Sequence, residues 1–271
     1  MTNSSTHLSD SKYNARAVDR ALSILMVFVN NPDVESLSLA EMVSHLDLPQ
    51  GTIFRLLAIL KNWGFIEQNL STKKYSLGVT SLSLGNTYLI KNDLRKRAYP
   101  ILKLLRDETG ETTHLAIREG VEAIYLEKLD GLYSIGLMSS RIGGRSPIYC
   151  TGVGKALIGF LPSQERENLL NSIEFFEFTK NTIICKELLE NELSKMQLQG
   201  YCTDNEEHEL GVACIAAPIF DHNDRVISAI SISGPTERIF DPEKKNVLVD
   251  KVKKKAHEIT TAMGGKNVNS L

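Results

Sequence analysis

The sequence has few cysteines, and their spacing disfavours the sites that depend on clustered thiols. Its four cysteines, Cys150, Cys185, Cys202 and Cys214, are scattered through 271 residues without a CxxC pair. This distribution argues against a disulfide framework and against a zinc ribbon, and it favours a reduced, cytoplasmic setting.

Long apolar runs and an excess of one charge sign are also missing. The longest early apolar run, residues 21–29, is too short to cross a bilayer and follows no signal-like segment. The formal net charge is -2 with 24% charged residues, a balance that argues against disorder and against a membrane surface as a partner. The length suffices for one large domain or two smaller ones, each with its own core.

Motifs of common catalytic sites are absent as well. The sequence has no Gly-x-Ser-x-Gly elbow and no His-Glu-x-x-His helix. Gly154-Lys155 suggests a phosphate-binding P-loop, but that loop needs glycine where Tyr149 stands and Ser or Thr where Ala156 stands. We therefore predict that the protein is not an enzyme and uses no cofactor.

One acidic segment could in principle hold a metal ion. Asp204, Glu206, Glu207 and His208 lie together and could act with Cys214. A single loop without repeated ligand spacing is a weak metal signal, and the simpler interpretation is that Glu207 and His208 are exposed loop residues. We predict no metal site.

The most informative pattern lies in residues 200–235. Two apolar runs, residues 212–220 and 226–233, flank the turn-forming segment 221–224. This arrangement predicts an antiparallel hairpin.

Alternation of side chains gives each strand of this hairpin one face of small residues. These are Val212, Cys214 and Ala216 on the first strand and Ala229, Ser231 and Ser233 on the second. If the two faces coincide, the sheet has a floor with two hydroxyls and a thiol. Such a floor leaves room for a ligand, whereas a plain β-core would carry larger apolar side chains.

The amino-terminal third has the pattern of a helical DNA-binding module. A polar tail at residues 1–12 is predicted to be disordered, and three helical patterns follow it. The first helix has apolar residues at helical spacing, namely Val18, Ala21, Leu22 and Leu25. The second opens with the capping box Ser38-Leu39-Ala40-Glu41 and is predicted to bury Leu39, Met42, Val43 and Leu46. The third is predicted to bury Ile53, Leu56, Leu57 and Leu60 and to end at Gly64. Two short helices joined by about four residues indicate a helix-turn-helix.

The predicted DNA-reading surface combines the third helix with a hairpin. Gln50, Gly51, Thr52 and Arg55 lie on the outer face near the start of that helix, as a recognition helix requires. Residues 65–68 and 74–77 form the predicted wing, with Lys73 and Lys74 at or near its tip. Residues 1–90 contain seven basic and seven acidic residues, so charge alone does not decide between DNA binding and a helical module that docks a protein.

The rest of the chain is predicted to form a mixed α+β unit after a linker. Residues 79–92 favour a polar linker helix that packs against a partner protomer, and residues 93–109 favour a helix kinked or broken near Pro100. The expected strands are residues 113–118, 123–129 and 132–138, and the expected helices are residues 163–170, 186–198 and 242–263. Gly152 and Gly154 precede the apolar run 156–161, an entry to a helix whose free amides favour an anion such as a ligand carboxylate.

Several ordered blocks of this sequence resemble the IclR family of bacterial transcriptional regulators, from about Tyr13 to Met263. The blocks are RAVDRAL from Arg16, GTIFRLL from Gly51, KYSLG from Lys74, SRIG from Ser140, YCTGVGKA from Tyr149, DNEE from Asp204, GVACIAAP from Gly211 and SISGP from Ser231. The resemblance implies a winged helix-turn-helix over residues 13–78, a linker helix over residues 79–92 that helps dimerisation, and a GAF-like effector-binding domain over residues 93–271.

The resemblance also implies which residues meet a small organic acid, keto acid or aromatic acid. By motif position, the effector pocket would use the amides of Gly152 and Val153, the side chains of Asp204, Cys214, Ser231 and Ser233, and an apolar wall of Ile135, Met138 and Val212. Asp204 would repel a carboxylate if it were ionised beside it, so we expect it to accept from a ligand hydroxyl or to lie opposite the acid group.

The implied function is that of a repressor that binds a palindromic operator in double-stranded DNA as a homodimer or a dimer of dimers. Family members often carry Ser or Lys where Gln50 and Gly51 stand, so the operator sequence does not follow from the resemblance. The segment 141–147, together with Thr179 and Thr182, is most similar to members that sense hexuronate-derived 2-keto-3-deoxy sugar acids.

Overall fold

A computed structural model describes residues 15–133 and 138–265 of the chain. The predicted disordered tail at residues 1–12 and the predicted pocket residue Ile135 lie outside these ranges. The chain divides into two compact units after Lys91, and each is described by itself. This division falls inside the predicted linker segment 79–92.

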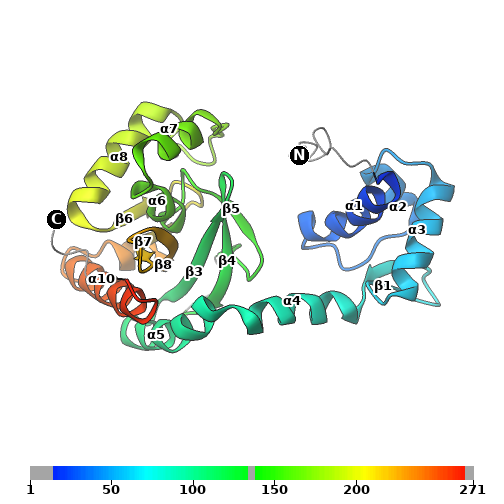
Figure 1. Cartoon of the computed structure of the whole chain (residues 1–271), viewed down its shortest axis with the longest axis horizontal. Coiled ribbons are helices and arrows are strands. Elements are labelled where there is room, and N and C mark those ends of the chain that lie inside the picture. The colour runs from blue at the N-terminus through cyan, green and yellow to red at the C-terminus, as the bar shows by residue number, and fades with distance from the viewer. Residues whose placement is uncertain (1–14, 134–137, 266–271) are drawn as a thin grey trace. The chain divides into compact units, whose positions relative to one another are not determined.

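The first unit is a three-helix module with a small hairpin. Its elements are α1 (Arg16–Asn30), α2 (Leu39–His45), α3 (Gln50–Asn62), β1 (Ile66–Gln68), β2 (Tyr75–Leu77) and α4 (Val79–Lys91) (Figure 1). The four residues predicted to be the inner face of α3 are all buried. In α1, by contrast, Val18 and Leu22 are exposed, and Ile24, Val27 and Phe28 form the buried face.

Two local motifs fix the start of α2 and the end of α3, as their sequences predict. The Ser38 hydroxyl accepts from the amide of Glu41 at 3.2 Å, and the Glu41 carboxylate accepts from the amide of Ser38 at 2.6 Å. At the end of α3, Gly64 has φ +73, and the amides of Gly64 and Phe65 donate to the carbonyls of Lys61 and Leu60. This Schellman motif turns the chain from α3 into β1.

The predicted linker forms a helix without a core of its own. No residue of α4 is buried. Its apolar side chains Val79, Leu82, Leu84, Tyr88 and Ile90 are all exposed. The helix α5 (Asp93–Thr109) then begins the second unit with an Asn92 cap.

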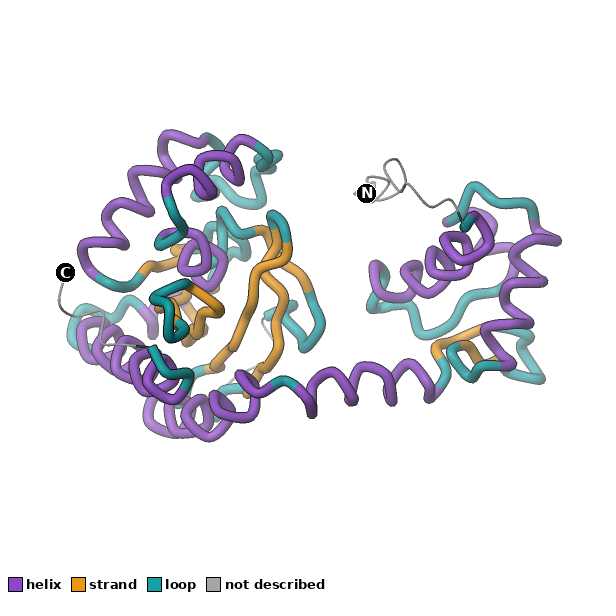
Figure 2. Tube along the Cα trace, viewed as in Figure 1, coloured by secondary structure: helices purple, strands orange, loops and turns teal. Residues whose placement is uncertain are grey.

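The second unit is built on a six-stranded antiparallel sheet covered by helices on both faces. The strand order is β5-β4-β3-β8-β7-β6. The strands are β3 (Thr112–Glu119), β4 (Glu122–Leu129), β5 (Arg145–Pro147), β6 (Cys202–Asn205), β7 (Val212–Phe220) and β8 (Val226–Pro235). Helices α6 (Gly152–Gly159), α7 (Ser163–Asn171) and α8 (Lys186–Gln199) lie on one side of it, and α5 and α10 (Lys245–Ala262) lie on the other, as Figures 1 and 2 show.

Side-chain size differs between the two faces of the sheet. Leu115, Ile215 and Ile230 pack under α5 and α10. Their neighbours Ala116, Ala216 and Ala229 face α6 and α8. The small side chains let α6 lie close to the sheet, and the predicted hairpin of β7 and β8 places Cys214 opposite Ser233 and Ala216 opposite Ser231.

Two sequence predictions about this unit differ from the structure. Leu132 and Tyr133 lie in a turn and Met138 lies in no regular element, so the expected strand at residues 132–138 is not present in its described part. The strand that pairs with the outer side of β4 is β5, not a strand at residues 132–138. Helix α5 is continuous through Pro100, so the alternative of a break near this residue is wrong. Pro100 is exposed, so the carbonyl that the proline ring leaves without an amide partner lies on the solvent side.

The remaining differences concern a short strand beside the pocket and the start of the closing helix. The acidic segment includes β6, a strand that the sequence pattern did not indicate. The closing helix begins at Lys245 rather than at residue 242, after a single turn of helix α9 (Thr236–Ile239). Within residues 15–133 and 138–265, no helix has the length and apolar character needed to cross a membrane.

Candidate functional site

A cavity of about 40 Å³ lies between the sheet and the start of α6. A cavity needs roughly 10–15 Å³ for one water molecule, so this one is larger than a site for a single water. All the predicted effector residues except Ile135, which lies outside the described residues, line it: Met138, Gly152, Val153, Asp204, Val212, Cys214, Ser231 and Ser233. The structure therefore brings together residues that are far apart in the sequence.

The floor of the cavity is the face of small residues on β7 and β8. The hydroxyl of Ser233 donates to the sulfur of Cys214 at 3.0 Å. Gly152 rests directly on this floor: a Cβ built there would meet the Cβ atoms of Cys214 at 3.1 Å and Ala216 at 3.3 Å. A side chain at position 152 would thus push α6 away from the sheet, because a glycine at this point permits the close approach.

His114 is a pocket residue that the sequence reasoning missed. Its Nδ1 lies 3.2 Å from the Ser231 hydroxyl, and its Nε2 lies 2.9 Å from the Ser140 hydroxyl. Burial, with the charge of Lys128, lowers the pKa of His114 to about 3, so the ring is neutral. The sequence signal that could have identified His114 is the alternation of side chains along β3. His114 pairs with Ser231 on the neighbouring strand β8 and therefore lies on the same face of the sheet.

Other missed lining residues are Tyr125, Ser140, Thr151, His208 and Glu209. The Tyr125 ring packs against His114 with centroids 5.1 Å apart. Burial raises the pKa of Tyr125, so its phenol is protonated and can donate or accept. The cavity lining that the structure describes thus contains neutral hydrogen-bonding groups and carboxyls, but no Lys or Arg.

The start of α6 supplies the group in the cavity best suited to an anion. Thr151 caps the helix by accepting from the amide of Gly154 at 3.2 Å. Among the described residues, the amides of Gly152 and Val153 donate no hydrogen bond, and both residues line the cavity. Free amides at a helix start favour a negative charge, and this agrees with the prediction from the glycine-rich sequence.

Asp204 lies opposite Cys214 in the β6–β7 pair and is buried in the wall of the cavity. Its Oδ1 accepts from the amide of Glu207 at 2.8 Å. Burial, and next the charge of Glu207, raise the pKa of Asp204 to about 7. Near neutral pH the carboxyl therefore exists in both forms, so it can accept from a ligand hydroxyl or donate to a ligand oxygen.

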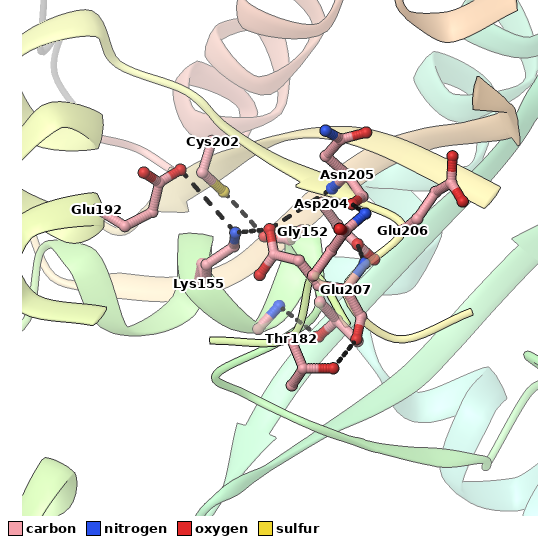
Figure 3. A network of polar contacts seen from close by, with 12 residues as sticks. Gly152, Lys155, Thr182, Glu192, Cys202, Asp204, Asn205, Glu206 and Glu207 are labelled. Atoms are coloured by element: carbon pink, nitrogen blue, oxygen red, sulfur yellow. Dashed lines mark hydrogen bonds and ion pairs between the residues drawn. The ribbon is translucent and has the colours of Figure 1, made fainter. Parts of the chain in front are cut away.

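Behind Asp204 lies a buried ion pair, which contradicts the expectation that Glu207 is exposed. The Lys155 ammonium is 2.6 Å from Oε1 of Glu207 and 4.0 Å from Glu192 (Figure 3). Lys155 is fully buried. Burial alone would lower the pKa of Lys155, but the negative charge of Glu207 raises it, so the lysine is charged.

Besides the ion pair with Lys155, hydrogen bonds from two threonines hold the loop that carries Glu207. Thr179 and Thr182 donate their hydroxyls to the carbonyls of Glu206 and Glu207, at 2.5 and 2.6 Å. These threonines therefore position the loop and do not line the cavity. His208 is also partly buried, and its ring packs against Phe178 with centroids 4.9 Å apart. Among the described residues no group of His, Cys, Asp and Glu is arranged to hold a metal ion.

Four of the predicted DNA-reading residues lie in the first two turns of α3. Gln50, Gly51 and Arg55 are exposed on α3, and Thr52 is half-buried. Nε of Arg55 donates to the carbonyl of Gly51 at 3.2 Å, which holds the guanidinium near the start of the helix.

In the wing, Lys73 has φ +60 at the turn. Lys74 lies 3.5 Å from Glu41, in an exposed ion pair. An exposed pair of this kind is worth at most about 1 kcal/mol, so Lys74 can exchange Glu41 for a phosphate.

Comparison with known proteins identifies both units. Residues 17–70 match the profile described as "IclR helix-turn-helix domain", and residues 86–261 match "Bacterial transcriptional regulator IclR C-terminal". The chain belongs to the IclR family. The helix-turn-helix predicted from the sequence is thereby confirmed, and so is the α+β second unit.

Individual IclR-family members are similar over most of the chain. The HTH-type transcriptional regulator XynR of Escherichia coli K12 is 37% identical over 231 residues, covering 85% of this chain and 90% of XynR. The transcriptional repressor IclR of the same strain is 33% identical over 232 residues, covering 85% and 84%. The crystal structure of IclR from Thermotoga maritima matches with a TM-score of 0.76 and 33% identity, over 92% of this chain and 99% of that one.

Membership of the IclR family decides between the hypotheses that the sequence left open. The chain is a DNA-binding transcriptional regulator, not an enzyme and not a helical module that only docks a protein.

Proposed function

We propose that this regulator is a repressor whose operator binding is modulated by a small organic acid bound in the cavity of the second unit. The observation that carries this proposal is the position of Gly152, Val153 and Asp204 around one cavity floored by Ser231 and Ser233. The helix start would hold the acid group, and the hydroxyls would bind the remainder of the ligand.

The chemistry of the lining favours a ligand with hydroxyl or keto oxygens beside its acid group. Ser231, Ser233, Ser140 and neutral His114 offer donors and acceptors but no positive charge. A 2-keto-3-deoxy sugar acid, the class suggested by the resemblance of segment 141–147, has both kinds of group. Asp204 with a pKa of about 7 can lie beside the acid group in its protonated form, which removes the repulsion expected from an ionised carboxylate.

The linker helix supports a dimer as the working unit. A helix of 13 residues with no buried side chain and several exposed apolar ones needs a partner surface to be stable. In a dimer or a dimer of dimers, two recognition helices would enter successive major grooves of a palindrome, about 34 Å apart. A ligand that prefers one spacing of these helices would change the affinity for the operator.

Arg55→Ala is expected to weaken binding to DNA from upstream of the protein's own gene by about 5-fold to 150-fold, because one bidentate base contact is worth roughly 1–3 kcal/mol. Fluorescence anisotropy with a labelled duplex measures the effect. The matched control is Arg225→Ala, which removes an equal charge from the exposed β7–β8 turn. Equal affinities of the two variants would remove Arg55 from the reading surface.

Replacing both Ser231 and Ser233 by Ala is expected to weaken binding of 2-keto-3-deoxygluconate by about 5-fold to 150-fold, since each lost hydrogen bond is worth roughly 0.5–1.5 kcal/mol. Thermal shift and calorimetry measure this affinity, and operator binding should be unchanged. Ser228→Ala is the control, because Ser228 is buried on the same strand but outside the cavity lining. A double variant with wild-type affinity would exclude the hydroxyls from the site.

A further inference from the structure

The recognition helix carries one large aromatic side chain that is not part of the buried face of the helix. The inner face of α3 consists of Ile53, Leu56, Leu57 and Leu60, all buried. Phe54 lies between this face and the outer one and is 56% exposed. Most of its ring is therefore available to a molecule outside the unit.

The position of Phe54 on the helix places it beside the predicted base-reading residues. It follows Gln50 by four residues and Gly51 by three, so all three lie on neighbouring parts of the surface. A Cβ built at Gly51 would have no atom within 4 Å, so the surface in front of Phe54 is open. Arg55, the next residue, has its guanidinium held toward the same end of α3 by the carbonyl of Gly51.

Duplex DNA offers one apolar group to such a side chain in the major groove. The groove edges of base pairs present hydrogen-bond donors and acceptors, except for the C5-methyl group of thymine. A phenyl ring makes no hydrogen bonds with base edges, and it gains from burying a methyl group that water would otherwise surround. A phosphate contact would not use an aromatic ring, since phosphates are bound by charged and hydrogen-bonding groups.

We propose that Phe54 is a specificity-determining residue of the operator interface, where its ring packs on the C5-methyl group of a thymine. Consecutive helical residues differ by about 100° and 1.5 Å, so Phe54 and Arg55 reach adjacent or nearly adjacent base pairs. Each half-site therefore contains a thymine one or two base pairs from the guanine that Arg55 contacts. This inference rests on the proposed reading of DNA by α3. It adds that Phe54 selects a thymine.

The test uses the full chain and a duplex selected with it from a random pool. Each thymine of the selected half-site is replaced, one at a time, by deoxyuridine, which removes only the methyl group. With the wild type, one replacement is expected to weaken binding by about threefold to tenfold, the value of burying one methyl group. With Phe54→Ala, the same replacement is expected to change the affinity less than 1.5-fold.

Trp63→Ala is the matched control variant. Trp63 is 72% exposed beyond the last residue of α3, so its removal also deletes an exposed aromatic ring from this module. This variant should keep the wild-type sensitivity to deoxyuridine, and all three proteins should have the same melting temperature. The inference is overturned if no single deoxyuridine matters to the wild type, or if the sensitive position stays sensitive in Phe54→Ala. A pool from which no sequence is enriched would instead contradict the reading of DNA by α3 itself.

Discussion

Lys155→Met is expected to lower the free energy of unfolding of the second unit by about 3–5 kcal/mol, the usual effect of removing one partner of a buried ion pair. The lysine is fully buried, and its partner Glu207 has a side chain only 9% exposed. Oε2 of Glu207 already has no hydrogen-bond partner among the described residues. Without Lys155, the negative charge of Glu207 would remain buried with no compensating charge in contact.

The matched control is Lys195→Met on the same cluster. Lys195 pairs with Glu192 at 3.7 Å but is 72% exposed, so its removal should change the free energy of unfolding by less than about 1 kcal/mol. Replacing both partners, Lys155→Met with Glu207→Leu, should recover most of the loss, because no uncompensated charge is left. Similar stabilities of Lys155→Met and Lys195→Met would show that the pair is not buried in solution.

Urea unfolding can report the two units separately. The single tryptophan of the chain, Trp63, lies in the first unit, so its fluorescence should keep the wild-type midpoint in Lys155→Met. Circular dichroism, which reports both units, should show the loss. A shift of the tryptophan midpoint would indicate damage beyond the second unit.

Asp204→Asn is expected to remove a pH-dependent part of the stability of the second unit. Burial and the charge of Glu207 raise the pKa of Asp204 from 3.8 to about 7 in the folded protein. The folded state therefore holds this proton more tightly than the unfolded state. The stabilisation is complete below about pH 4, is lost as pH rises to about 7, and amounts to about 4 kcal/mol in total.

The measurement is the difference in unfolding free energy between wild type and Asp204→Asn from pH 4 to pH 8. The amide keeps an oxygen to accept from the amide of Glu207, so the hydrogen bond at 2.8 Å is preserved in the variant. Other groups near Asp204, namely Lys155, Glu207, His208, Glu209 and Cys214, are present in both proteins, so their titration largely cancels. The wild type should lose stability relative to the variant as pH rises, and a difference independent of pH would contradict the raised pKa.

Much of this architecture follows from local patterns in the sequence. The hairpin of β7 and β8 forms at the predicted turn, and its register brings the two small-residue faces together, because alternation and a four-residue turn leave few ways to pair the strands. The buried face of α3, the capping box at Ser38 and the left-handed Gly64 are also as predicted. Each of these features depends on residues within one continuous stretch of the sequence.

The parts that the sequence could not provide depend on contacts between distant segments. His114 enters the pocket only because β3 pairs with β8, a contact that joins residues 117 positions apart. The sequence predicts Glu207 as an exposed loop residue, because its partner Lys155 is 52 positions away and no local pattern joins the two. The short strands β5 and β6 lack alternation over enough residues to be recognised.

In the proposed dimer, the absence of any buried side chain in α4 links folding to assembly. A solitary helix of this length is only marginally formed in water, so its order depends on the surface that covers it. At protein concentrations below those that support the dimer, the segment would lose much of its helicity, and each DNA-reading module would be attached to its sensor by a flexible tether. The spacing of two such modules would then no longer be fixed, and cooperative recognition of a palindrome would be lost with it.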